Sequence, residues 1–253
     1  MSKFLITGVS SGIGRVLTKR LIGEGHIVWG IARGEDLLID LKRELKNSKL
    51  FIYSHFDVSG DGVWGIFVSQ MKKADFIPDV VIFDAAILKN DLADGLDVGL
   101  TKKILDVNFL SILYAIRELL PIFRERTQFI AISSSSAFKG SGVEGVGYPS
   151  SKAALSIAFE SLHQKYGCNY SFKVVFFGPV RTGMTPFKRR FPLSLSVEDA
   201  VSSILKSIQG TRVLYFYPAL LFFFVKAIRL LPSDLYFKIL SRLESFHAKM
   251  ERL

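Results

Sequence analysis

The chain has 253 residues, 49% hydrophobic and 22% charged, a composition that excludes a disordered protein and allows one large domain or two small ones. Its single cysteine, Cys168, excludes an internal disulfide framework and fits a reducing compartment. A net charge of +10 suits phosphorylated ligands or anionic membranes, but no nucleic-acid module and no basic run longer than residues 188–190 is present, so we expect no nucleic-acid partner. The first residues lack the basic and apolar regions of a secretory signal, which predicts a cytoplasmic protein.

Short apolar runs alternate with longer amphipathic stretches along the chain. We expect strands at residues 3–7, 26–32, 50–55, 80–83, 128–132, 172–177 and 213–217. We expect helices at residues 13–23, 37–46, 62–74, 100–124, 150–166 and 197–209. Such alternation predicts an α/β fold of βαβ units, in which helices cover both faces of a parallel sheet. No linker or repeat divides the chain, so residues 1–217 are interpreted as one domain.

A glycine-rich loop follows the first strand and opens the first helix, with the sequence Thr-Gly-Val-Ser-Ser-Gly-Ile-Gly at residues 7–14. Glycines at such a turn let the backbone approach a pyrophosphate, which then sits at the N-terminus of the helix. The strand–loop–helix context favours a dinucleotide site over a plain turn. The loop residues that we assign to cofactor binding are Gly8, Ser10, Ser11, Gly12, Ile13 and Gly14.

The second strand ends at Ala32 and is followed by Arg33. A site that prefers NAD commonly carries an acid at this strand end to hold the ribose hydroxyls, whereas an arginine suits the 2′-phosphate of NADP. Arg33 therefore predicts NADP rather than NAD as the cofactor. The alternative, in which Arg33 is merely solvated, stays open at this point.

Tyr148 and Lys152 are four residues apart, shortly after a run of four serines at residues 133–136. In a helix this spacing puts both side chains on one face. A positive charge beside a phenol favours the phenolate, so we expect Lys152 to lower the pKa of Tyr148. The pair is a candidate general acid and base, and a nearby serine hydroxyl could orient a carbonyl. The four histidines are scattered, so no metal site is expected.

Taken in order and at their spacing, these motifs resemble the short-chain dehydrogenase/reductase family over roughly residues 3–215. The resemblance implies a Rossmann-type doubly wound sheet of about seven strands, and hydride transfer between NADP(H) and a carbonyl or alcohol. It also implies a homodimer or homotetramer that pairs through the long helices. Five further residues match cofactor-contacting segments of the family: Asp57, Val58, Ala85, Val180 and Thr182.

The resemblance assigns the catalytic roles. Tyr148 exchanges a proton with the substrate oxygen, Lys152 assists Tyr148 and binds the nicotinamide ribose, and Asn108 holds a water that connects Lys152 to solvent. The catalytic serine holds the substrate oxygen. Counting from the strand favours Ser134, because side-chain alternation fixes the register, whereas counting back from Tyr148 favours Ser135. We prefer Ser134 as the catalytic serine and keep Ser135 as the alternative.

Two segments depart from the family pattern. The usual Asn-Asn-Ala-Gly after the fourth strand is Phe-Asp-Ala-Ala at residues 83–86, and Phe177 replaces a proline before Gly178. The first change keeps alive a second hypothesis, a non-catalytic NADP-binding regulator on the same fold.

Residues 182–195 correspond to the substrate lid of the family. Its apolar Met184, Phe187 and Phe191 beside basic residues 188–190 favour a lipid-like substrate. Residues 218–253 form an apolar and amphipathic helical extension, interrupted by Pro232 and too short in its uncharged part to span a membrane. This extension is interpreted either as a peripheral membrane contact or as an oligomer contact, with plain core packing as the third alternative.

Overall fold

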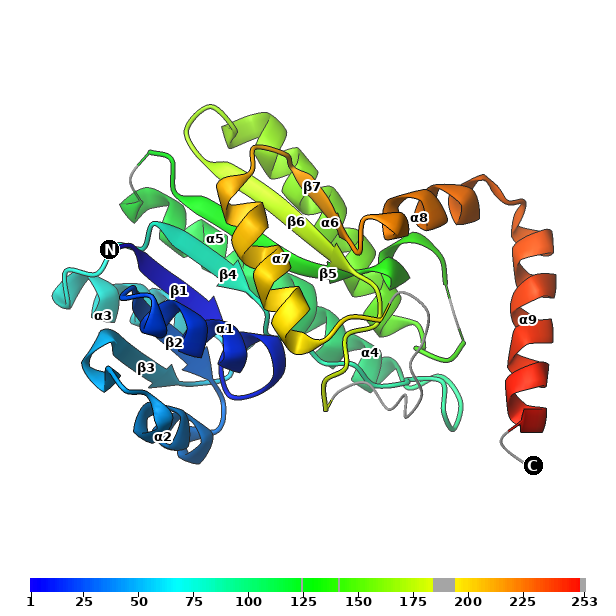
Figure 1. The fold of residues 1–253 in the computed structure, drawn as a ribbon, viewed down its shortest axis with the longest axis horizontal. Helices are drawn as coiled ribbons and strands as arrows, with labels where there is room; N and C mark the ends of the chain where they lie inside the picture. The colour runs from blue at the N-terminus through cyan, green and yellow to red at the C-terminus, as the bar shows by residue number, and fades with distance from the viewer. Residues whose placement is uncertain (124, 141, 184–193, 251–253) are drawn as a thin grey trace.

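The computed structural model describes residues 1–123, 125–140, 142–183 and 194–250. Within these residues one parallel sheet has the strand order β3-β2-β1-β4-β5-β6-β7 (Figure 1). The strands are β1 Lys3–Thr7, β2 Ile27–Ala32, β3 Phe51–His55, β4 Val80–Phe83, β5 Gln128–Ser134, β6 Ser171–Phe177 and β7 Leu214–Tyr217. Strand order reverses between β1 and β4, the switch point at which doubly wound sheets bind ligands at the carboxyl ends of their strands.

Helices cover both faces of this sheet (Figure 1). They are α1 Gly12–Gly23, α2 Glu35–Glu44, α3 Val63–Lys73, α4 Val98–Leu105, α5 Ser111–Leu119, α6 Gly147–Tyr166 and α7 Val197–Gln209. Because strand side chains alternate between the faces, neighbouring residues of β1 belong to different cores. Leu5 packs with apolar residues of α3, α5 and α6, while Phe4 and Ile6 pack with those of α1, α2 and α7. The expected α/β sheet with helices on both faces is confirmed.

The helix expected at residues 100–124 is broken into four pieces. After α4 come a π-helical turn at Asp106–Leu110, then α5, then a 3₁₀ turn at Leu120–Ile122. Pro121 lacks the N–H that an α-helix needs, which accounts for the end of α5. The π-helical turn contains Asn108, and such turns are frequent at functional sites.

The C-terminal residues form α8 Leu220–Leu230 and α9 Ser233–Met250. Helix α8 packs on the domain, because Leu221 and Val225 are buried in the same core as α5 and α6. Helix α9 extends away from the sheet (Figure 1), and its first turn is tied to the body, where Tyr236 donates to the carbonyl of Gly140 at 3.3 Å. In the part of the chain that the structure describes, no helix is long and apolar enough to cross a membrane.

Candidate active site

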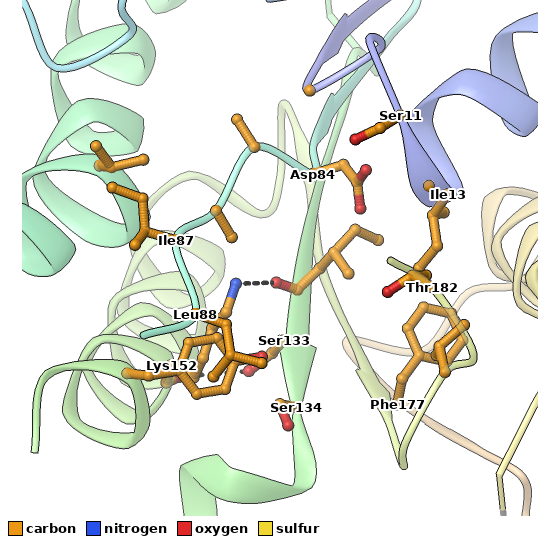
Figure 2. Close-up of a pocket in the computed structure, with 18 of the residues that line it drawn as sticks. Ser11, Ile13, Asp84, Ile87, Leu88, Ser133, Ser134, Lys152, Phe177 and Thr182 are labelled. Carbon is orange, nitrogen blue, oxygen red and sulfur yellow. Dashed lines mark hydrogen bonds between the residues drawn. The ribbon is translucent and has the colours of Figure 1, made fainter. Parts of the chain in front are cut away.

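A cleft of about 690 Å³ lies at the carboxyl ends of the strands around the switch point. Figure 2 shows Ser11 and Ile13 on one side of it and Ser134 and Lys152 on the other. Most residues that the sequence singled out line this cleft: Gly8, Ser10, Ser11, Gly12, Ile13, Arg33, Asp57, Val58, Ala85, Ser134, Ser135, Tyr148, Lys152, Val180 and Thr182. The fold therefore brings together segments that lie far apart in the chain.

The glycine loop has the backbone that its residue types predict. Gly8 and Gly12 have φ values of +85° and +54°, where a side chain would be strained. A Cβ on Gly8 would lie 2.8 Å from the backbone nitrogen of Ala85, so the loop packs directly on the end of β4. Gly14 does not line the cleft; its N–H donates to the carboxylate of Asp84 at 2.9 Å. The N-terminus of α1 thus opens onto the cleft, as anion binding requires.

Arg33 and Asp57 follow β2 and β3 and flank one end of the cleft. The guanidinium Nη1 of Arg33 lies 3.7 Å from Oδ2 of Asp57, and the Arg33 side chain is 61% exposed. Burial raises the pKa of Asp57, but hydrogen bonds from Ser59 and the charge of Arg33 outweigh it and keep this pKa below its ordinary value. A positive charge is therefore available at the place where the sequence predicts it.

Ser134, Tyr148 and Lys152 meet at the end of β5. Ser134 lies close enough to Tyr148 to lower the pKa of its hydroxyl, and the Oγ of Ser134 lies 2.9 Å from the Oγ of Ser136. Lys152 donates from Nζ to the carbonyl of Ile132 at 2.9 Å, the bond drawn in Figure 2, and stands 5.7 Å from the centre of the Tyr148 ring. Helix α6 begins at Gly147, earlier than expected, so both Tyr148 and Lys152 lie in it.

The charges around this cluster act differently from the sequence-based expectation. Burial and the nearby carboxylate of Glu144 raise the pKa of Tyr148, although the hydrogen bond with Ser134 opposes them. Burial lowers the pKa of Lys152 to about 8, and the carboxylate of Asp84 opposes that change. The pKa of Tyr148 is thus raised, and not lowered as we expected from Lys152, because desolvation dominates in this geometry.

Asn108 is fully buried behind the cleft. Its side chain accepts from the N–H of Ile87 at 2.7 Å and donates to the carbonyl of the same residue at 2.9 Å. It also donates to Oγ of Ser151 in α6 at 3.1 Å. Asn108 therefore joins the loop after β4 to the helix that carries Tyr148.

Sequence reasoning did not predict several lining residues. Glu144 stands close enough to affect the pKa of Tyr148, while Ile87, Leu88 and Val143 add apolar surface. No motif marks them, because they come from loops whose course depends on the tertiary fold. In the lid, residues 184–193, with Met184, Phe187, Phe191 and the basic residues 188–190, lie outside the described residues. Leu195, which lies beyond that segment, donates its N–H to the carbonyl of Pro179 at 2.9 Å.

Comparisons with known proteins agree with this geometry. The sequence profile of the family described as short chain dehydrogenase matches residues 2–192. Human "Epidermal retinol dehydrogenase 2" is 28% identical over 98% of this chain and 86% of that protein. The Arabidopsis thaliana "NADPH-dependent pterin aldehyde reductase" is 29% identical over 60% of this chain, but the match spans only 63% of that relative's length.

Among solved structures, a short chain dehydrogenase from Burkholderia cenocepacia in complex with NADP superposes with a TM-score of 0.79. The two proteins share 18% identity, and the match covers 94% of this chain and 97% of that one, so it bears on the fold. With the family profile covering most of the chain, this protein belongs to the short-chain dehydrogenase/reductase family.

Proposed function

We propose that the protein is an NADP(H)-dependent oxidoreductase of an apolar carbonyl or secondary alcohol. The observation that carries the proposal is the cluster of Ser134, Tyr148 and Lys152, which lies in the same cleft as the glycine loop. A proton donor and a dinucleotide cradle in one cleft are what hydride transfer to a carbonyl needs.

The cradle fits a dinucleotide phosphate. Gly8 and Gly12 leave the backbone free of side chains, and the N-terminus of α1 favours negative charge. Arg33 supplies a cation for a 2′-phosphate, which supports NADP over NAD. The residues that would hold the adenine ring are Asp57 and Val58. Ala85, Val180 and Thr182 would border the nicotinamide half.

The bound cofactor supplies the hydride, and the protein supplies the proton and the orientation. Tyr148 would donate the proton in the reductive direction, because its hydroxyl lies in the same cleft as Ser134 and the glycine loop. Ser134, which lines the cleft with Tyr148, would hold the substrate oxygen, while Ser135 is the second choice. Lys152 would bind the ribose, and Asn108 would order the water that leads to solvent.

The substrate is proposed to be apolar, because Ile87, Leu88, Val143 and Phe177 line the cleft beside the serines. The named substrates of relatives form a suitable test panel: retinal, a pterin aldehyde, benzil and 3-ketodihydrosphingosine.

The deciding experiment measures reduction of this panel with NADPH and NADH by the wild type and by Tyr148→Phe. We expect the wild type to prefer NADPH. Deletion of the hydroxyl should lower kcat by about 10²–10⁴-fold, the usual contribution of a general acid, while the Kd for NADPH stays nearly unchanged. The matched control is Tyr114→Phe, which removes a hydroxyl from an exposed tyrosine of α5 and should leave kcat unchanged. NADPH binding without turnover of any panel member would instead support the regulator.

We also propose that α8 and α9 meet an anionic membrane surface. Their exposed apolar side chains include Leu220, Phe223, Leu230 and Phe237. Exposed Lys226, Arg229 and Lys238 lie in the same helices. The competing proposal is an oligomer contact between copies of the chain, and both are tested below.

A further inference from the structure

Asp91 is a buried carboxylate that no part of the proposed chemistry uses. It lies in the loop between β4 and α4, and its relative exposure is 1%. A buried carboxylate is costly unless its oxygens are hydrogen-bonded. Both oxygens are satisfied, and the donors come from two distant parts of the chain.

The first set of donors comes from the start of α6. The N–H of Val146 donates to Oδ1 of Asp91 at 2.6 Å, and the N–H of Gly147 donates to Oδ2 at 2.8 Å. These are among the first N–H groups of the helix, which have no partner within it. Tyr148 is the very next residue. The cap of α6 is thus supplied by a side chain from another loop.

The second donor comes from α4. Oγ1 of Thr101 donates to Oδ2 of Asp91 at 2.5 Å. Helix α4 leads into the π-helical turn of Asn108, which itself bonds Ser151 of α6 at 3.1 Å. Asp91 therefore joins its own loop to α4, which leads to Asn108, and to the start of α6, which carries Tyr148 and Lys152.

The glycines around Asp91 are consistent with this role. Gly145 has a φ of +79°, and a Cβ there would lie 2.0 Å from Oδ1 of Asp91. A Cβ on Gly147 would lie 3.0 Å from Oδ2. The absence of side chains at Gly145 and Gly147 therefore lets the N–H groups of Val146 and Gly147 reach the carboxylate of Asp91.

We propose that Asp91 is a positioning residue for the reaction: it caps α6 from outside the helix and so sets where the hydroxyl of Tyr148 stands against the substrate. Asp91 touches neither substrate nor cofactor in this role. The expected fall in kcat rests on the proposed function, whereas the expected effect on the start of α6 does not.

The test compares Asp91→Asn with the wild type in the carbonyl reduction assay. An amide has one acceptor oxygen instead of two, so one of the two α6 N–H groups loses its partner. A shift of catalytic geometry by less than 1 Å can cost about 10²-fold, so we expect kcat to fall by about 10- to 100-fold. The Kd for NADPH should change less than kcat, because Asp91 has no bond to the glycine loop that would hold the phosphates and reaches the cofactor only through Lys152 of α6.

Amide hydrogen exchange of the segment 142–150 is the second measurement, and it does not depend on turnover. Loss of a charge-assisted acceptor should speed exchange there by about tenfold or more. The matched control is Asp199→Asn, the same change at an exposed carboxylate that caps α7. It should alter neither kcat nor exchange at residues 142–150.

The outcomes separate the two proposals. If the wild type reduces no carbonyl, the proposed function fails, and faster exchange in Asp91→Asn still supports the cap. If Asp91→Asn loses no kcat, or loses kcat and NADPH affinity equally together with thermal stability, Asp91 has no special positioning role. Thr101→Val removes one donor only, and a fall in kcat smaller than that of Asp91→Asn is expected.

Discussion

Asp84 is the residue at which this site departs furthest from its family in charge. It follows β4, where the family pattern has an amide, and its carboxylate accepts the N–H of Gly14 at 2.9 Å. Burial raises the pKa of Asp84 to about 6, although the charge of Lys152 and the bond from Gly14 both oppose the change. A carboxyl group with a raised pKa binds its proton more tightly in the folded than in the unfolded state.

This raised pKa predicts how stability depends on pH. Between the ordinary pKa of 3.8 and about 6 the folded chain binds more protons than the unfolded one, so the contribution of Asp84 to the free energy of unfolding falls as pH rises. The full cost at neutral pH corresponds to roughly 3 kcal/mol or less. Asp84→Asn keeps an acceptor for Gly14 and removes the charge. It should raise the urea midpoint at pH 7.5 and leave it unchanged near pH 4.

The control for this prediction is Asp94→Asn, which removes the charge of an exposed aspartate. Its effect on the urea midpoint should be small and should not vary across the same pH range. A neutral-pH midpoint of Asp84→Asn equal to or below that of the wild type would show that Lys152 already compensates the buried charge.

The candidate catalytic and cofactor-binding residues could be predicted from the sequence, but a residue that positions them through the tertiary fold could not. Tyr148 and Lys152 are spaced so that a helix places them on one face. Arg33 follows the second strand, at the position where a dinucleotide-binding fold contacts the ribose or its 2′-phosphate. Strand register favours Ser134 over Ser135, and Ser134 is the serine that lowers the pKa of Tyr148, which supports that choice. Asp91 is different, because the two α6 N–H groups that it accepts lie 55 and 56 positions away, and only the tertiary fold brings them near.

Among the elements, α7 has its C-terminal carbonyls hydrogen-bonded by a buried lysine from a neighbouring strand. Lys173 of β6 is 3% exposed. Its three N–H groups are shared among four acceptors: the Oε1 of Gln128 at 2.7 Å and the carbonyls of Ser207, Ile208 and Gly210 at 3.0, 3.0 and 2.7 Å. The last carbonyls of a helix have no partner within it, and a cation there also opposes the helix dipole. Lys173 thus joins the end of α7 to the sheet.

We expect Lys173→Met to destabilise the fold by about 2–4 kcal/mol, because methionine has a similar volume but removes the donor that these acceptors share. Urea denaturation followed by circular dichroism measures the change. Lys206→Met makes the same substitution at an exposed lysine in the last turn of α7 and should shift stability by less than about 0.5 kcal/mol. Equal midpoints for the two variants would contradict the assigned role of Lys173.

The order of strands and helices could be predicted because apolar residues recur with a different period in each. The ends of these elements depend on tertiary contacts, which the local sequence does not show. The stretch 100–124 has apolar residues at helical spacing throughout, yet it breaks at the π-helical turn of Asn108 and again near Pro121. Helix α6 starts at Gly147, before Pro149, because Asp91 supplies its cap. Both differences occur next to the candidate site, where function and regular structure compete.

At the scale of the whole molecule, the C-terminal helices leave much apolar surface in contact with solvent. Leu220, Phe223 and Leu230 of α8 are 65%, 67% and 84% exposed, and Phe237 of α9 is 51% exposed. Burying such side chains in a membrane interface is favourable, and the basic residues beside them add attraction to anionic lipids. An oligomer contact would bury the same side chains but would not depend on lipid charge, so the two proposals can be separated.

We expect the full chain to float with vesicles that contain anionic lipid, to float less with neutral vesicles, and to be released as salt screens the attraction. Replacing Phe223, Leu230 and Phe237 together by serine should lower binding by about tenfold or more, because each change removes apolar area from the interface. The control replaces Ile66 and Val98 by serine, two residues that are 64% and 67% exposed on α3 and α4. If the wild type stays with the unbound fraction on every vesicle, while the triple variant alone becomes a smaller particle in sedimentation, these helices join copies of the chain and do not bind membranes.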